Sequence, residues 1–173
     1  PSPSYFLITA YQLTQVQFEF VVRDYLMHGT PFLGMYSGSD YNAFIRMCKM
    51  HEAGKNLLPD NAPYTRYFLS DQNGVIYAQG DIRHYPTKTL TNYAGYIGYG
   101  VLPSFRGRGY GKLMCALLCR EAKKYGYTRV LVTCNIENQA SARIIECNGG
   151  VFEDIRYWKA NNCYMKRYWI DLT

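Results

Sequence analysis

The sequence predicts a single α/β (α+β) domain with a mixed, mostly antiparallel twisted sheet of six to seven strands, flanked by about four helices. Three observations support this. The 173 residues are 48% hydrophobic and 18% charged, a globular composition in a chain long enough to bury a core. Strand-like and helix-like segments alternate, and after residue 95 they run strand, glycine turn, helix, strand, helix, strand, strand. No repeat or linker divides residues 1–173.

The N-terminal third predicts one strand and two helices. Residues 5–10, "YFLITA", form a short apolar run typical of a strand. Residues 13–29 carry apolar side chains at helical spacing and end at a glycine, a common C-terminal stop. A second helix is expected within residues 39–55, where Ser39 and Asp40 are candidate caps.

The middle of the chain predicts strands joined by a tight turn. Residues 71–74, "DQNG", favour a hairpin because Asn-Gly readily supplies positive φ angles. The turn would join residues 64–70 to a return strand at 75–83. Residues 95–103, "GYIGYGVLP", form the next expected strand.

The remaining elements follow a βαβ order before ending in a hairpin. A helix over about 109–125 is expected to stop at Gly126. The next segment, "RVLVTC", is continuously apolar, as in a strand buried on both faces, and should run parallel to the strand before the helix. The helix over 109–125 is expected to bury Leu113, Met114, Leu117 and Leu118. The chain is then expected to close with a helix over 138–148 and strands over 151–158 and 163–172.

Most of the net charge of +6 lies in one segment. Residues 106–124 contain six Lys and Arg against Glu121 alone, and this clustering indicates one anionic site. Part of it also suits the helix dipole, since Lys123 and Lys124 fall in a last helical turn. A sequence pI of about 9.0 leaves nucleic-acid binding as another reading, but no reading helix is recognisable, so no nucleic-acid partner is expected.

Cysteine usage and hydropathy favour a cytoplasmic protein without metal. The six cysteines form no CxxC pair, and Cys115 and Cys119 share a helix face with no histidine beside them, so packing is the favoured role and no metal site is expected. No apolar run approaches the roughly 20 residues that span a bilayer, and residues 1–12 do not read as a secretory signal. We therefore expect no membrane partner.

The segment "PSFRGRGYGKLM" predicts an anion site at a helix N-terminus. The first N–H groups of a helix are unpaired and carry partial positive charge. Gly107, Gly109 and Gly111 would let these groups approach a phosphate, and Arg106 and Arg108 add charge. A diphosphate fits best, but the spacing matches neither a dinucleotide fingerprint nor a nucleotide P-loop.

The pattern Arg106-x-x-Gly109-x-Gly111 does match a known signature. It resembles the acetyl-CoA motif of the GNAT superfamily of N-acetyltransferases, and the later "NQASARIIECNGG" resembles that family's second CoA-contacting helix. The closing "RYWIDL" and "GYIGYGV" look like a small bacterial branch of it. The resemblance covers about residues 75–173, the acetyl-CoA-binding core, whereas residues 1–70 match only loosely and would form the variable acceptor side.

The resemblance implies where acetyl-CoA lies as cosubstrate. Backbone groups of residues 99–102 would pair with the pantetheine arm, and residues 107–112 would hold the pyrophosphate. The two parallel strands should splay apart to admit it, often with a β-bulge on the first. In the alternative interpretation, Arg108 is a solvated side chain and Asn138 caps its helix. The implied contacts are Tyr99, Val101, Leu102, Arg106, Gly107, Arg108, Gly109, Tyr110, Gly111, Lys112, Asn138 and Ser141.

The implied reaction is direct attack of a primary amine on the thioester. Backbone N–H groups near Val101 and Leu102 would stabilise the oxyanion. Many family members carry a tyrosine acid seven residues after the helix asparagine, but Ile145 occupies that position here. The leaving thiolate would take its proton from water, Tyr164 or Tyr157. Because the usual acid is missing, a catalytically weak CoA-binding regulatory module is the alternative function.

The catalytic base and the acceptor stay open at this stage. Asp81 and His84 lie on the strand before the cofactor strand, three residues apart and so on opposite faces. His84 has the better intrinsic pKa for a base, whereas Asp81 and Arg83 share a face on which they would pair. The acceptor would be a small-molecule amine or a peptide, and the protein a monomer or homodimer.

Overall fold

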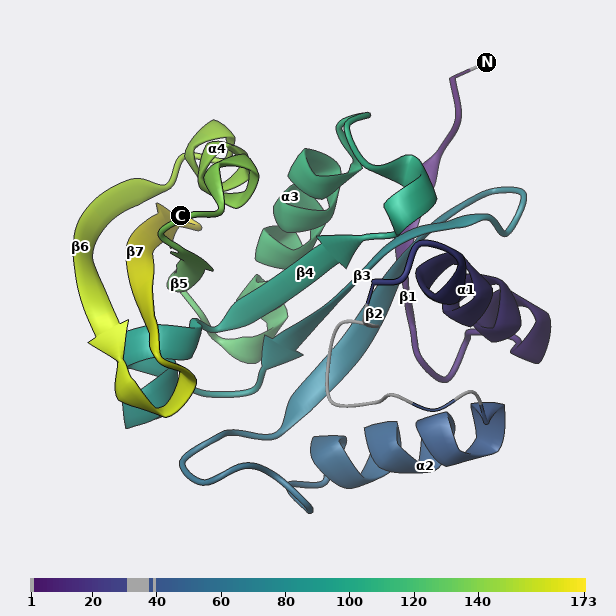
Figure 1. Cartoon of the computed structure of the whole chain (residues 1–173), viewed down its shortest axis with the longest axis horizontal. Coiled ribbons are helices and arrows are strands. Elements are labelled where there is room, and N and C mark those ends of the chain that lie inside the picture. Colours follow the sequence, from purple (N-terminus) through teal and green to yellow (C-terminus); the bar gives the residue numbers. More distant parts are fainter. Residues whose placement is uncertain (1, 31–37, 39) are drawn as a thin grey trace.

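The computed structural model describes residues 2–30, 38 and 40–173 (Figure 1). The helices are α1 (Gln15–Met27), α2 (Tyr41–Glu52), α3 (Tyr110–Ala122) and α4 (Gln139–Cys147). The strands are β1 (Tyr5–Thr9), β2 (Tyr64–Asp71), β3 (Ile76–Arg83), β4 (Ile97–Val101), β5 (Arg129–Asn135), β6 (Val151–Trp158) and β7 (Cys163–Asp171). The α/β class and the predicted order of elements are confirmed.

The strands form two sheets, where the sequence suggested one. β1, β2, β3 and β4 lie side by side in that order, and β5, β7 and β6 form a second sheet. Every paired neighbour is antiparallel. The expected splayed strand pair, β4 and β5, is therefore the boundary between the sheets.

At this boundary the two strands start together and then part. The N–H of Tyr96 donates to the carbonyl of Leu131 at 2.8 Å, and no ladder joins the strands within the described residues. Beyond this contact, residues 97–99 and 132–135 line one cavity, as expected of strands that diverge while running in the same direction. The β3–β4 register runs without a shift, so the bulge expected on β4 is absent from its described pairing.

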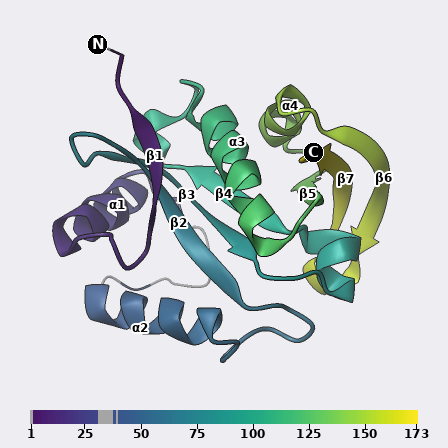
Figure 2. The same ribbon diagram turned by 180° about the vertical axis from the view of Figure 1, so that it is seen from behind.

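The first sheet is covered on both faces because its strands alternate apolar side chains. Tyr67 and Leu69 of β2 pack in a cluster with Met114 and Leu118 of α3. Phe68, which points the opposite way, packs in a second cluster with residues of α1 and α2. Figure 2 shows the molecule from the side on which α3 crosses the sheet.

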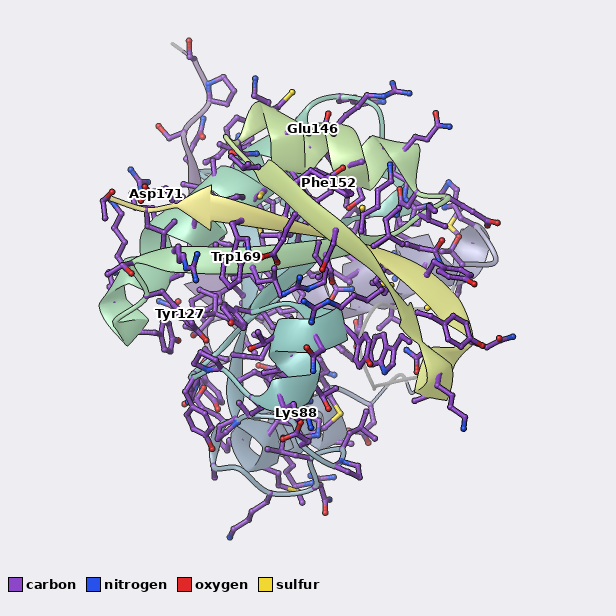
Figure 3. All side chains as sticks on the ribbon, turned by 90° about the vertical axis from the view of Figure 1, so that its left-hand side faces the viewer. Lys88, Tyr127, Glu146, Phe152, Trp169 and Asp171 are labelled. Atoms are coloured by element: carbon purple, nitrogen blue, oxygen red, sulfur yellow. The ribbon has the colours of Figure 1, made fainter. Side chains whose placement is uncertain are left out.

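The second sheet is covered by α4. Figure 3 shows α4 lying across one end of β6 and β7. The Tyr168 hydroxyl of β7 donates to Glu146 of α4 at 3.1 Å, and its ring meets Phe152 of β6 edge-on at 5.6 Å. These contacts fix α4 beside the boundary between the sheets.

Several local signals act as predicted. Asp40 caps α2 by accepting the N–H of Ala43 at 2.8 Å, whereas Ser39 lies outside the described residues. Gly74 has a φ of +80° in the predicted hairpin turn. The buried face of α3 differs from the prediction, because Leu113 and Leu117 are only half-buried. The buried residues of α3 are Gly111, Met114, Cys115, Leu118, Cys119 and Ala122, and the two cysteines pack as expected.

One element had no sequence signal. Residues Leu90–Ala94 form a single π-helical turn just before β4, ending at Gly95 with a φ of +79°. Gly95 packs tightly on β5, since a Cβ there would come within 3.0 Å of the Leu131 carbonyl oxygen. Within the described part of the chain, no helix has the length and apolar character to cross a bilayer.

Candidate active site

A cavity of about 650 Å³ lies between β4, the turn that opens α3, and α4. The strands part at this point, so α4 forms one wall and the edge of β4 the other. The size suits a large organic cofactor arm. The lining residues are Tyr99, Gly100, Val101, Arg106, Gly107, Gly109, Tyr110, Gly111, Lys112, Asn138, Ala140, Ser141, Arg143 and Ile144.

The turn before α3 presents bare backbone N–H groups to this cavity. Gly107 and Gly109 have φ angles of +76° and +87°, which side chains rarely tolerate. Gly109 is the N-cap of α3 and provides no side-chain cap. No backbone N–H between residues 107 and 112 donates a hydrogen bond within the described residues. This arrangement is typical of a helix N-terminus that binds phosphate.

Gly111 has a different reason to be glycine. Its missing Cβ would lie 2.6 Å from Cδ1 of Ile144 on α4 and 3.4 Å from Cγ2 of Val101. The glycine therefore allows α3 and α4 to approach closely. This packing sets the width of the cavity, a role beyond the phosphate contact expected from the sequence.

Three cations line the cavity, and no carboxylate of the described residues does. Arg106 and Lys112 were predicted, whereas Arg143 was missed. Its only sequence signal is its position in a helix that begins beside Asn138. Arg108 does not line the cavity; it is exposed and lies 6.0 Å from the centre of the Phe105 ring, which fits the solvated alternative.

The edge of β4 is polar where the cavity meets it. In the β3–β4 ladder, Leu102 N–H donates to the carbonyl of Tyr77 at 2.9 Å. Antiparallel pairing alternates, so the backbone groups of Tyr99 and Val101 point away from β3 and toward the cavity. Arg106 Nε donates to the Val101 carbonyl at 3.3 Å. Leu102 is buried and its N–H is already used, so it does not supply the free donor that the sequence suggested.

A second cavity, of about 340 Å³, continues across the split between the sheets. It shares Tyr99, Asn138 and Ser141 with the first, so the two meet at these side chains. Asn138 Oδ1 accepts the Ser141 N–H at 3.0 Å and caps α4, as the alternative reading expected. The other lining residues are Arg83, Ala94, Ile97, Gly98, Val132, Thr133, Cys134, Asn135, Trp158 and Met165.

Tyr99 lines both cavities at this junction, and its hydroxyl oxygen is buried next to them. The oxygen is enclosed, lies beside Cys115 and Ser141, and makes no hydrogen bond of ordinary geometry. Burial raises the pKa of Tyr99, and the Cys115 thiol raises it further, so the phenol stays protonated at neutral pH. Ile145, which stands where many family members have tyrosine, is fully buried in the core.

The candidate catalytic residues lie away from the junction. His84 contacts Thr65 Oγ1 through Nε2 at 2.8 Å and stacks on Tyr125, and burial lowers its pKa. Tyr164 is 54% exposed and packs against Tyr157. Neither lines the two cavities. Sequence reasoning missed the Tyr99 hydroxyl, because only the backbone of Tyr99 had been assigned a role.

Asp81 belongs to a charged cluster behind the second cavity. Its Oδ1 lies 2.7 Å from Arg83 Nη1, which confirms the predicted pairing, and its Oδ2 lies 3.9 Å from Arg66. Arg83 lines the second cavity, whereas Asp81 does not. Asp81 and His84 have different neighbours on the two faces of β3, as their spacing predicted. The described residues hold no group of three or more His, Cys, Asp or Glu that could bind a metal ion.

Comparison with known proteins agrees with this geometry. A sequence model described as the acetyltransferase (GNAT) family matches residues 34–149. A spermidine N-acetyltransferase variant from Vibrio cholerae shares the fold with a TM-score of 0.62 and 13% identity, over 96% of this chain and 94% of its own. A putative acetyltransferase from Salmonella typhimurium, solved with acetyl-CoA, has a TM-score of 0.61 and 13% identity, over 98% of this chain and 94% of its own. A putative phosphinothricin N-acetyltransferase has a TM-score of 0.60 and 14% identity, over 98% of this chain and 99% of its own. No curated protein matched the sequence.

Proposed function

Because this chain belongs to the acetyltransferase (GNAT) family, we propose that it moves the acetyl group of acetyl-CoA to the primary amine of a small molecule. The observation that carries this proposal is the turn from Arg106 to Lys112, where unpaired N–H groups and cations face a cavity that opens onto the edge of β4. The match to the family covers acetyl transfer; the acceptor and the site residues are our proposal.

The residues of the first cavity fit the parts of acetyl-CoA. The N–H groups of residues 107–112 would bind the pyrophosphate, with Arg106, Lys112 and Arg143 opposing its charge. The backbone of Tyr99 and Val101 would pair with the amides of the pantetheine arm, as a further strand does. The thioester would then lie near the meeting point of the two cavities, beside Asn138 and Ser141.

The chemistry requires a neutral amine and a proton for the leaving group. The amine nitrogen forms a bond to the thioester carbonyl carbon, the carbon–sulfur bond breaks, and the sulfur leaves with the electron pair. The Tyr99 N–H, which faces away from β3 at the junction, would donate to the carbonyl oxygen as negative charge develops there. We assign the acid role to Tyr99, whose hydroxyl would protonate the thiolate and would recover its proton through the Ser141 side chain beside it, which lines both cavities. The amine's own proton would pass to water.

The second candidate is a CoA-binding module with little activity. Ile145 favours it, because an aliphatic side chain cannot supply the usual proton. Tyr99 answers this objection in part, since its side chain lines both cavities and its hydroxyl, which stays protonated, lies beside Ser141. The two functions share the cofactor site and differ only in turnover.

Two measurements separate them. Titration calorimetry with CoA and acetyl-CoA tests the site, and we expect binding that weakens with salt because charges contribute. Thiol release from acetyl-CoA with a panel of primary amines tests the reaction. Binding with turnover supports the enzyme, binding with no turnover supports the module, and no binding at millimolar CoA would refute both.

A further inference from the structure

The second cavity holds an arginine whose hydrogen-bonding capacity is largely unused. Arg83 donates no side-chain hydrogen bond of ordinary geometry within the described residues, although Nη1 lies 2.7 Å from Asp81. Its Nε and Nη1 atoms are enclosed, so Nη2 is the guanidinium nitrogen left at the cavity. A guanidinium N–H donates a strong, charge-assisted hydrogen bond to a carboxylate.

Among the described residues, the one charged side chain that lines this cavity is the cation Arg83. The Asp81 carboxylate, which does not line the cavity, lies 2.7 Å from Arg83 and 3.9 Å from Arg66. The side chains of Arg83 and Asp81 are only 18% and 14% exposed, so water screens them weakly. Among the described lining residues no other side chain is charged at neutral pH. The cavity therefore favours an anion over a second cation.

The position of Arg83 relates it to the acceptor. Glycine at position 98 makes room for the guanidinium, since a Cβ there would lie 3.1 Å from Nη1. Gly98 directly precedes Tyr99, at the junction where the thioester would lie. The lining also includes two large apolar side chains, Met165 and Trp158, and Trp158 stacks on Tyr93. The amine, the anionic group and the apolar group of an acceptor would thus each contact a matching part of the cavity.

We infer that the acceptor is a small zwitterionic amine of the amino-acid type, whose carboxylate pairs with Arg83 while its amine meets the thioester. The inference rests on the proposed function and deepens it. In the reaction only the amine nitrogen changes: it gains the acetyl group and loses a proton, and the carboxylate stays as it is. A polyamine fits poorly, because the described lining offers no carboxylate to its additional cations.

Matched acceptor pairs test this inference. Thiol release is measured with phenylalanine against 2-phenylethylamine and leucine against 3-methylbutylamine, with spermidine as the polyamine. We expect kcat/KM about tenfold to a hundredfold higher for the amino acid of each pair, the range of a charged hydrogen bond. Arg83→Gln should lower that ratio toward one, whereas Arg120→Gln, a change at an exposed arginine of α3, should leave it as in the wild type.

The outcomes are distinguishable from failure of the proposed function. Equal or better use of the amines without a carboxylate, or of spermidine, would overturn the acceptor class while leaving acetyl transfer intact. An unchanged ratio in a folded Arg83→Gln protein would overturn the role of Arg83. If that variant fails to fold, Arg83→Met keeps much of the side-chain length without the charge, and an unreduced ratio there would also overturn it. Acetyl-CoA binding with no turnover on any acceptor would overturn function and acceptor together.

Discussion

Replacing Tyr99 by phenylalanine separates the catalytic role of this residue from any structural one. Tyr99→Phe removes one oxygen that is enclosed and has no well-aligned partner. An unsatisfied buried polar group costs about 1–3 kcal/mol, so its loss should leave the free energy of unfolding unchanged or raise it by about 1 kcal/mol. Loss of a general acid typically lowers the rate by about 10²-fold to 10⁴-fold. Activity should therefore fall sharply in a protein that is at least as stable.

The assay is kcat for thiol release at saturating acetyl-CoA, together with urea unfolding and CoA calorimetry. CoA affinity should hold, because only the backbone of Tyr99 faces the pantetheine path. Tyr164→Phe is the matched control, since Tyr164 was the acid suggested by the sequence and its side chain is exposed. A Tyr99→Phe enzyme that keeps its rate refutes the reasoning, and a large loss in Tyr164→Phe would move the acid to β7.

Three further predictions concern the turn before α3, the charge of the first cavity and His84, which directly follows β3. Arg143→Gln should weaken CoA binding about threefold to tenfold at low salt because Arg143 lines the first cavity, whereas the control Arg120→Gln should leave the affinity unchanged. Calorimetry that shows an equal loss of CoA affinity in both variants would contradict a local contact. Gly109→Ala should lower the urea-derived free energy of unfolding by about 1–2 kcal/mol through strain alone, since its Cβ meets nothing within 4 Å; unchanged stability would argue against the φ of +87°. Burial lowers the pKa of His84, so its contribution to stability is present above about pH 6.5 and is lost as the pH falls below it. His84→Gln should therefore lose less thermal stability between pH 7 and pH 5 than the wild type, whereas a hundredfold drop in kcat would instead support the base role suggested by the sequence.

The turn before α3 and the cap of α4 were predictable from the sequence because their signals are local. The glycines at 107 and 109 predicted a loop that opens a helix, and Asn138 predicted a helix cap, whereas the positive φ angles of the two glycines were not predicted. The pairing of Asp81 with Arg83 followed from strand alternation. The helix and strand order was likewise visible in the apolar pattern.

Tertiary structure alone decided the rest, because it depends on which distant segments meet. Strand register determines that the Leu102 N–H donates to the Tyr77 carbonyl while the backbone groups of Val101 face the cavity. The approach of α4 to α3 gives Gly111 its packing role and brings Arg143 to the cavity. The separation of β4 from β5 leaves Tyr99 at the junction of the two cavities and Arg83 in the lining of the second. Spacing along one chain carries no information about such contacts, since they arise from packing between residues far apart in sequence.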